Sequence, residues 1–210
     1  MADMPLRPAA FIDRDGVINR ELHHVHRIED FHVLPGVVSG LQALAAGGYA
    51  LVVVTNQGGI AKGLYGPEQF EALTRHMLER FAAQGIEFAG VYHCPHHPQG
   101  SVPSWAVPCT CRKPEPGLLL RAADELGLDL ERSVMIGDKI SDVEAARRAG
   151  VGRLVLVESG HGLPADTAGV AHHRCAGLAE AAQWVLASGA TPHTPPHTRL
   201  PLAPAPACTP

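Results

Sequence analysis

A chain of 210 residues with 46% apolar content can bury one hydrophobic core, and it is too short to hold a second large domain. The formal net charge of −4 at pH 7 excludes the strongly basic surface that nucleic acid requires, so no nucleic-acid partner is expected. The sequence has five cysteines, no signal peptide and no apolar run near the roughly 20 residues of a membrane span. These features predict a cytoplasmic protein without a membrane anchor or a disulfide framework.

The predicted elements alternate between strands and helices along the chain. Short apolar runs predict buried strands over residues 9–12, 50–54, 90–93, 133–136 and 153–157. Apolar residues at helical spacing predict helices over residues 35–47, 67–84, 117–126, 141–149 and 177–187. The alternation predicts an α/β fold, a doubly wound (Rossmann-like) parallel sheet with helices on both faces. We expect residues 1–188 to form a single domain and residues 189–210, rich in Pro, Thr and His, to form a flexible tail.

Two aspartates one residue apart, Asp13 and Asp15, follow the first predicted strand and precede Gly16. Carboxylates this close repel one another unless a cation or a proton lies between them. The spacing therefore indicates either a divalent metal or a division of acid and base roles. A solvated aspartate turn with Gly16 at positive φ explains the same letters about equally well.

Polar residues useful for phosphate chemistry also lie near the ends of later strands. Thr55 follows the second predicted strand, Lys113 precedes a helix, and Asp138 follows the fourth strand. A hydroxyl and an ammonium group can hold a phosphoryl group, which favours Thr55 and Lys113 for that role. Hard oxygen ligands suit Mg²⁺, and Asp13, Asp138 and a backbone carbonyl near Asp15 would supply them.

Three cysteines and a histidine gather in the loop over residues 94–111, namely Cys94, His96, Cys109 and Cys111. Two closely spaced ligand pairs suit a tetrahedral, closed zinc site with a structural role. Reduced loop cysteines beside a solvated histidine would also fit. We favour Zn²⁺ because this proline-rich loop has almost no core of its own.

The order Asp13-Arg14-Asp15-Gly16, Thr55, Lys113, and Gly137-Asp138 followed by Asp142 resembles the haloacid dehalogenase (HAD) superfamily of aspartate-based phosphotransferases. The resemblance implies that Asp13 attacks phosphorus and that Asp15 first protonates the leaving oxygen and later activates water. It implies the same holding roles for Thr55 and Lys113, with Mg²⁺ bound by Asp13, Asp138 and the Asp15 carbonyl.

Residues 55–63, 94–100 and 111–114 narrow the resemblance to the D-glycero-D-manno-heptose-1,7-bisphosphate 7-phosphatase family, over about residues 11–157. The resemblance implies a Mg²⁺-dependent phosphatase without a large cap domain that acts on a small phosphorylated sugar. It would remove the 7-phosphate through an aspartyl phosphate and supply heptose 1-phosphate for lipopolysaccharide core or a related glycan. The implied substrate-binding residues are Arg14, Glu21, His24, Asn56, Gln57, Gly58, Arg112 and Lys139. Residues 21–24, Glu-Leu-His-His, depart from the family's usual acidic residue, histidine, glycine and tyrosine.

Two other functions remain as alternatives at the level of sequence. Histidinol-phosphate phosphatases resemble the chain in the aspartate motif, the threonine loop and a related zinc loop; the insertion over residues 98–108 and the Arg112-Lys113 pair count against them. A non-catalytic phosphosugar-binding module is the alternative of a different class, and the presence of every reactive residue counts against it. No exposed apolar helix face stands out, so we expect a monomer.

Overall fold

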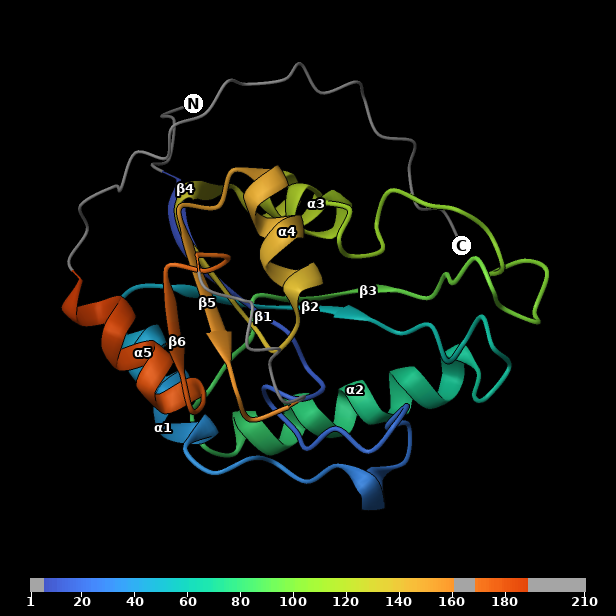
Figure 1. Ribbon diagram of the computed structural model, residues 1–210. Helices are drawn as coiled ribbons and strands as arrows, with labels where there is room; N and C mark the ends of the chain where they lie inside the picture. The colour runs from blue at the N-terminus through green and yellow to red at the C-terminus, as the bar shows by residue number, and fades with distance from the viewer. Residues whose placement is uncertain (1–5, 161–168, 189–210) are drawn as a thin grey trace, which may run out of the picture.

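The computed structural model describes residues 6–160 and 169–188 (Figure 1), so the tail expected over residues 189–210 lies outside the described part of the chain. One parallel sheet in the order β3-β2-β1-β4-β5-β6 organises the molecule. Its strands are β1 (Arg7–Ile12), β2 (Ala50–Asn56), β3 (Gly90–Cys94), β4 (Leu128–Gly137), β5 (Arg153–Val157) and β6 (His173–Cys175). The doubly wound parallel sheet that the sequence predicts is therefore confirmed.

The strand order creates a switch point between β1 and β4. From β1 the chain adds β2 and β3 on one side, and then it crosses to the other side to add β4, β5 and β6. Ligands of open α/β sheets bind outside the carboxyl ends of the strands at such a reversal. Asp13 lies at this point, where its backbone N–H donates to the carbonyl of Ile136 in β4 at 3.0 Å.

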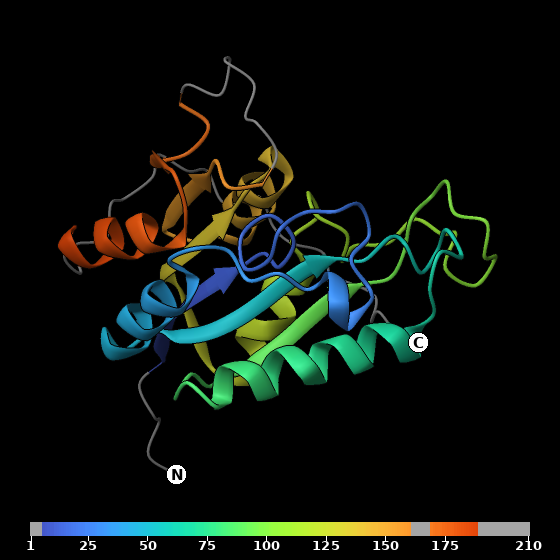
Figure 2. The ribbon, with the colours of Figure 1, turned by 90° about the horizontal axis from the view of Figure 1, so that it is seen from below.

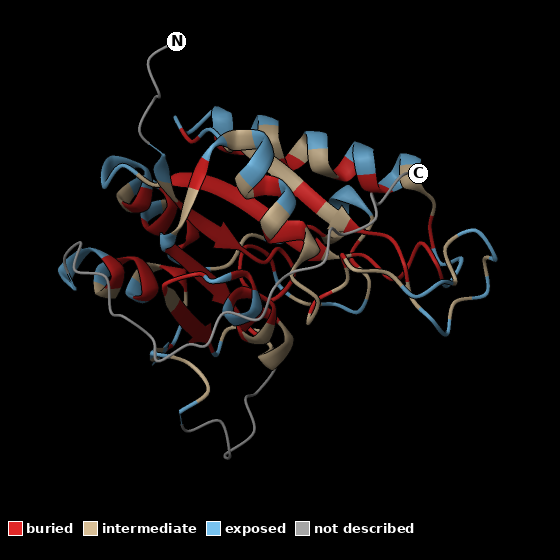
Figure 3. Ribbon diagram, turned by 90° about the horizontal axis from the view of Figure 1, so that it is seen from above, coloured by how far each residue is buried: buried red, intermediate tan, exposed pale blue. Residues whose placement is uncertain are grey.

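Helices cover both faces of the sheet because strand residues alternate between two apolar clusters. In β1, Ala10 and Ile12 pack with α1 (Val37–Ala46), α2 (Pro67–Ala82) and α5 (Leu178–Ala187), which lie below the sheet in Figure 1 and face the viewer in Figure 2. Ala9 and Phe11 pack with α3 (Gly117–Leu126) and α4 (Ile140–Ala149) on the opposite face. Figure 3 shows the strands as mostly buried and the outer sides of the helices as exposed. Burial on both faces explains the continuous apolar runs of β1 and β2.

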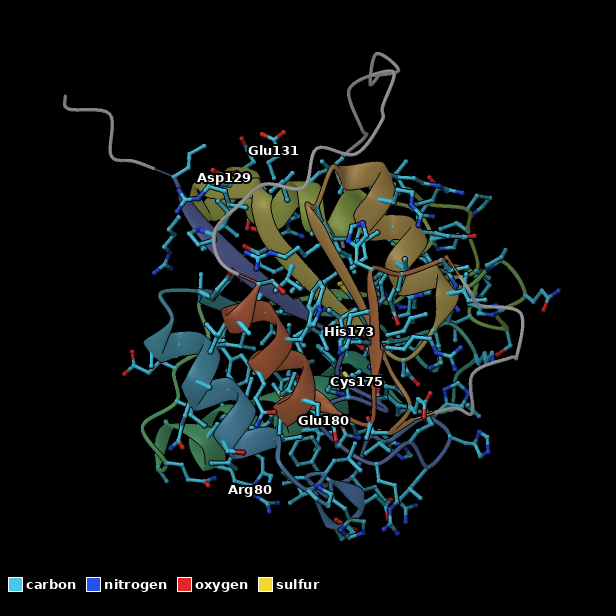
Figure 4. All side chains as sticks on the ribbon, turned by 60° about the vertical axis from the view of Figure 1, so that its left-hand side comes forward. Arg80, Asp129, Glu131, His173, Cys175 and Glu180 are labelled. Carbon is cyan, nitrogen blue, oxygen red and sulfur yellow. The ribbon has the colours of Figure 1, made fainter. Side chains whose placement is uncertain are left out.

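The structure adds elements that the apolar pattern did not predict. Strand β4 begins at Leu128, five residues before the predicted start, and the edge strand β6 and a short 3₁₀ helix, η1 (Ile28–Asp30), were not predicted. Figure 4 shows Asp129 and Glu131 on the first half of β4 and His173 and Cys175 on β6. No helix in the described ranges is long and apolar enough to cross a membrane.

Candidate active site

A cavity of about 420 Å³ opens at the carboxyl ends of β1 and β2, beside the first turn of α4. Segments far apart in the sequence meet there, as the switch point predicts. Most of the side chains that line the cavity are charged or can form hydrogen bonds. They are Asp13, Asp15, Glu21, His23, His24, Thr55, Asn56, Gln57, Gly58, Lys62, His97, Arg112, Lys113, Lys139, Ser141 and Asp142.

Lys113 forms the charged centre of the cavity floor. Its Nζ lies 3.1 Å from Asp13 Oδ1 and 2.6 Å from Asp142 Oδ1, and it donates to the carbonyl of Val54 at 2.8 Å. Burial alone would lower the pKa of Lys113, but the attraction of Asp13 and Asp142 outweighs burial and raises it. The side-chain amide of Asn56 brackets the lysine by bonding its backbone N–H and carbonyl, both at 3.0 Å. A permanently charged ammonium group is thus fixed beside Asp13.

Asp13 is a buried carboxylate that carries an electrostatic penalty. Burial raises its pKa from 3.8 to about 6; Lys113 counteracts this rise, and the like charge of Asp142 adds to it. A divalent cation at this position would relieve the penalty. The three carboxylates Asp13, Asp138 and Asp142 are buried and offer oxygens within 4.8 Å of one another, so the donor set fits a hard cation such as Mg²⁺.

Gly16 lets the backbone pass close to this carboxylate group. Its φ is +89°, and a Cβ at this position would lie 2.3 Å from Asp138 Oδ2. The positive φ that a solvated turn would explain therefore occurs in a turn packed on a buried acidic centre. Asp138 itself is 1% exposed and lies behind the cavity wall.

Asp15 has the opposite environment to Asp13. Arg14 Nη2 donates to both of its oxygens, at 3.2 and 2.9 Å, and Asn19 Nδ2 and Gln57 Nε2 each donate to it at 2.9 Å. Burial would raise the pKa of Asp15, but the charge of Arg14 and the hydrogen bonds from Asn19, Arg14 and Gln57 lower it. Two carboxylates in one motif with opposed pKa shifts are characteristic of divided roles in an active site.

Most of the residues expected at the substrate do line the cavity, but Arg14 does not. Its side chain is 1% exposed, and besides Asp15 it contacts the carbonyl of Val25 and Gln57 Oε1. Arg14 therefore supports Asp15 from beneath the cavity floor. This orientation could not be predicted, because a DxDG motif does not show which way the side chain between its two aspartates points.

Sequence reasoning missed several residues at the cavity mouth, chiefly Lys62 and His97. His24 and His97 each lie within the field of Lys62, and burial together with that charge lowers the pKa of both histidines. Arg112, which was predicted, contributes a further positive charge near His97. The only sequence signal for Lys62 was its place in the glycine-rich segment that follows Thr55. The mouth is thus lined by basic side chains.

The four predicted zinc ligands come together at the base of the loop that follows β3. Cys94 Sγ lies 3.6 Å from Cys109 Sγ and 3.7 Å from His96 Nδ1, and Cys111 Sγ lies 3.4 Å from the same nitrogen. Tetrahedral Zn²⁺ would separate two sulfurs by about 3.8 Å and a sulfur from a nitrogen by about 3.5 Å. A disulfide would need about 2.05 Å between sulfurs, and none of these three cysteines forms one. The cluster fits a tetrahedral metal site.

Comparison with known proteins agrees with this architecture. Residues 110–181 match a family model described as HAD-hydrolase-like. The D-glycero-β-D-manno-heptose-1,7-bisphosphate 7-phosphatase of Yersinia pestis is 45% identical over 181 residues, which cover 86% of this chain and 90% of that protein. The protein of the same name from Vibrio cholerae is 48% identical over 154 residues, 73% of this chain and 83% of that protein.

Two solved structures show the same fold. A HAD-like phosphatase from Mesorhizobium loti has 35% identity and a TM-score of 0.77, covering 88% of this chain and 86% of that one. The D,D-heptose 1,7-bisphosphate phosphatase of B. bronchiseptica, in complex with magnesium and phosphate, has 28% identity and a TM-score of 0.73, covering 87% and 99%. By its identity to curated relatives over most of their length, the chain belongs to the D-glycero-β-D-manno-heptose-1,7-bisphosphate 7-phosphatase family of HAD phosphatases.

Proposed function

We propose that the chain hydrolyses the 7-phosphate of D-glycero-β-D-manno-heptose 1,7-bisphosphate, releasing inorganic phosphate and heptose 1-phosphate for lipopolysaccharide core or a related glycan. The observation that carries this proposal is the meeting of Asp13, Asp15, Thr55 and Lys113 at one cavity. The names of the relatives supply the sugar and the β configuration.

The reaction proceeds in two displacements at phosphorus. The Asp13 carboxylate attacks the 7-phosphate while the bond from phosphorus to the sugar oxygen breaks, and Asp15 delivers a proton to that oxygen. Asp15 then takes a proton from the water that attacks phosphorus, which frees phosphate and restores Asp13. An incoming phosphate brings negative charge beside Asp15 and raises the pKa of its carboxyl, so that Asp15 takes up from solvent the proton that it delivers in the first displacement.

Lys113 and Thr55 stabilise the transferring phosphoryl group. Lys113 supplies a fixed positive charge next to Asp13, and Thr55 lines the same wall of the cavity. Mg²⁺ held by Asp13, Asp138 and the Asp15 carbonyl would neutralise charge on the phosphoryl oxygens. The carboxylate of Asp142 accepts a hydrogen bond from the backbone N–H of Lys139 at 3.0 Å and forms an ion pair with Lys113. These contacts suit a role for Asp142 in positioning Lys113.

Zn²⁺ in the cluster of Cys94, His96, Cys109 and Cys111 would act as a structural staple. Arg112 Nη1 donates to the carbonyl of His96 at 3.2 Å, so the staple also sets the position of a cavity-lining cation. The same loop carries His97. Arg112 and Lys62 give the cavity mouth the positive charge that a second phosphate on the sugar requires, and His24 and His97, whose pKa values are lowered, add neutral imidazoles that can donate hydrogen bonds.

Phosphate release from a set of substrates tests the assignment. We expect the highest kcat/KM with the β anomer of heptose 1,7-bisphosphate, ahead of the α anomer and of L-histidinol phosphate, and no activity once a chelator removes Mg²⁺. A higher kcat/KM for L-histidinol phosphate would assign the chain to the alternative phosphatase.

Asp13→Asn should bind the sugar bisphosphate without releasing phosphate. A wild-type protein that binds the sugar bisphosphate without turnover would indicate a binding module.

A further inference from the structure

We propose that Tyr65 is a positioning residue for the acid–base step: its hydroxyl fixes the side-chain amide of Gln57, and that amide in turn fixes the carboxyl of Asp15. Tyr65 does not line the cavity. It acts through Gln57, which lies between it and the reacting groups. The inference rests on the proposed role of Asp15 as the acid that protonates the leaving sugar oxygen.

The hydrogen bonds around Gln57 determine which way its amide faces. Tyr65 Oη donates to Gln57 Oε1 at 2.5 Å, and Arg14 Nη2 donates to the same oxygen at 3.2 Å. A guanidinium group can only donate, so the atom of Gln57 that faces Arg14 must be the acceptor oxygen. The amide nitrogen is therefore turned toward the cavity.

The amide nitrogen of Gln57 donates hydrogen bonds to two residues of the proposed reaction. Gln57 Nε2 donates to Asp15 Oδ2 at 2.9 Å and to Thr55 Oγ1 at 2.9 Å. Because Thr55 accepts this bond, its own hydroxyl hydrogen is available to donate to a phosphoryl oxygen. A reversed amide would present its oxygen to Asp15, where two acceptors would repel each other. Arg14 thus sets which way the amide faces, and the shorter bond from the Tyr65 hydroxyl holds the amide in that productive orientation.

Tyr65 is built into the fold so that its hydroxyl stays in this place. Its side chain is buried in a small apolar cluster with Ile60 and Phe70, and its ring stacks on His26 with centroids 4.8 Å apart and an interplanar angle of 6°. A Cβ at Gly59 would lie 2.2 Å from the ring, so glycine is needed for the ring to pack this closely. Burial also raises the pKa of Tyr65, which keeps the hydroxyl protonated and able to donate.

The test is a comparison of two leaving groups in the Tyr65→Phe variant. This change removes the hydroxyl and keeps the ring packing. A sugar alkoxide needs the proton from Asp15 in order to leave, whereas p-nitrophenolate leaves without it, so only the sugar ester depends strongly on the placement of Asp15. The measured quantity is the ratio of kcat/KM for heptose bisphosphate to kcat/KM for p-nitrophenyl phosphate. We expect Tyr65→Phe to lower this ratio roughly 10-fold, which is part of the 10²–10⁴-fold rate acceleration that a positioned general acid supplies.

Tyr92→Phe is the matched control, because it removes the hydroxyl of another buried tyrosine, which donates to Glu125 at 2.9 Å outside the cavity. In Tyr92→Phe, the ratio of kcat/KM for the two esters should stay within about twofold of wild type. If Tyr65→Phe lowers the melting temperature too far for assay, Gln57→Met should lower the same ratio at least as much. An unchanged ratio in the folded variant, or equal losses with both esters, would overturn the inference. A wild-type protein inactive on heptose bisphosphate would instead refute the proposed function.

Discussion

Asp13 and Asp15, one residue apart in the sequence, show how local surroundings divide a motif into two roles. Asp15 is surrounded by donors that lower its pKa, while Asp13 is buried among other carboxylates and forms an ion pair with Lys113. In the proposed mechanism, the folded chain accepts an unfavourable charge at Asp13 in order to present its nucleophile. Stability and reactivity are opposed at this residue.

The raised pKa of Asp13 predicts that Asp13→Asn stabilises the metal-free protein. The carboxyl of Asp13 binds a proton more tightly in the folded state than in the unfolded state. Protonation of Asp13 therefore stabilises the folded state; this stabilisation is complete below about pH 3.8 and is lost as the pH rises through about 6. Asparagine resembles the protonated carboxyl at every pH. In chelator, the variant should melt above wild type at pH 7 to 8, by up to about 3 kcal/mol of unfolding free energy, and the gap should close toward pH 4.

Added Mg²⁺ should reverse that order, because a cation that binds the folded wild type stabilises it and the variant lacks one ligand. Thermal melts across pH, with chelator and with Mg²⁺, provide both comparisons. A variant that melts below wild type in chelator at pH 8 would show that the Asp13 carboxylate is a stabilising partner of Lys113 and not a strained one.

Lys62 should act on the part of the substrate that does not react. Lys62→Ala removes a positive charge at the cavity mouth, so we expect KM for the heptose bisphosphate to rise roughly 10-fold with little change in kcat. KM for a sugar monophosphate should change less than about twofold. Arg75→Ala, at an exposed position of α2, is the control for loss of one surface charge. Equal effects of Lys62→Ala on both substrates would place the second phosphate elsewhere.

At the scale of elements, the strand segments with a short apolar run were predicted, including the edge strand β3, and the strand segments without one were not. Only the second half of β4 is continuously apolar. Its first half pairs through Leu128 and Asp129 with Arg7 and Pro8, and a register shift between Pro8 and Ala10 separates these pairs from those of the second half. Strand β6 has three residues, two of them polar, and it forms by adding to the edge of β5. Tertiary pairing creates such strands, and apolar periodicity does not reveal them.

We expect the loop over residues 94–111 to depend on a metal bound by Cys94, His96, Cys109 and Cys111 more than on apolar burial. Cys109→Ala should lower the melting temperature and the bound zinc together, while kcat for the remaining folded protein falls less. Cys175→Ala changes a buried cysteine outside the cluster and should leave bound zinc unchanged. Metal analysis and thermal melts test this prediction. An unchanged zinc content and melting temperature in Cys109→Ala would show that the cluster does not stabilise the fold.

At the scale of the whole molecule, the meeting of the candidate site residues could be predicted because the topology of a doubly wound sheet brings strand ends together. Asp13 and Asp138 directly follow β1 and β4, and Thr55 is the next-to-last residue of β2, so sequence order was enough to place them at one edge of the sheet. Lys62, His97 and Tyr65 could not be placed in the same way. Their positions depend on how two loops fold over the strand ends, and neither apolar period nor motif spacing encodes that arrangement.

The central claim, that the assembled strand ends make Asp13 a nucleophile, is tested most directly by trapping the covalent intermediate. Quenching the enzyme during turnover of heptose bisphosphate and reducing it with borohydride converts an aspartyl phosphate to homoserine, which peptide mass spectrometry locates. We expect homoserine at position 13 in the wild-type protein and no homoserine at that position in Asp13→Asn. Homoserine at another aspartate, or turnover by Asp13→Asn at the wild-type rate, would contradict it.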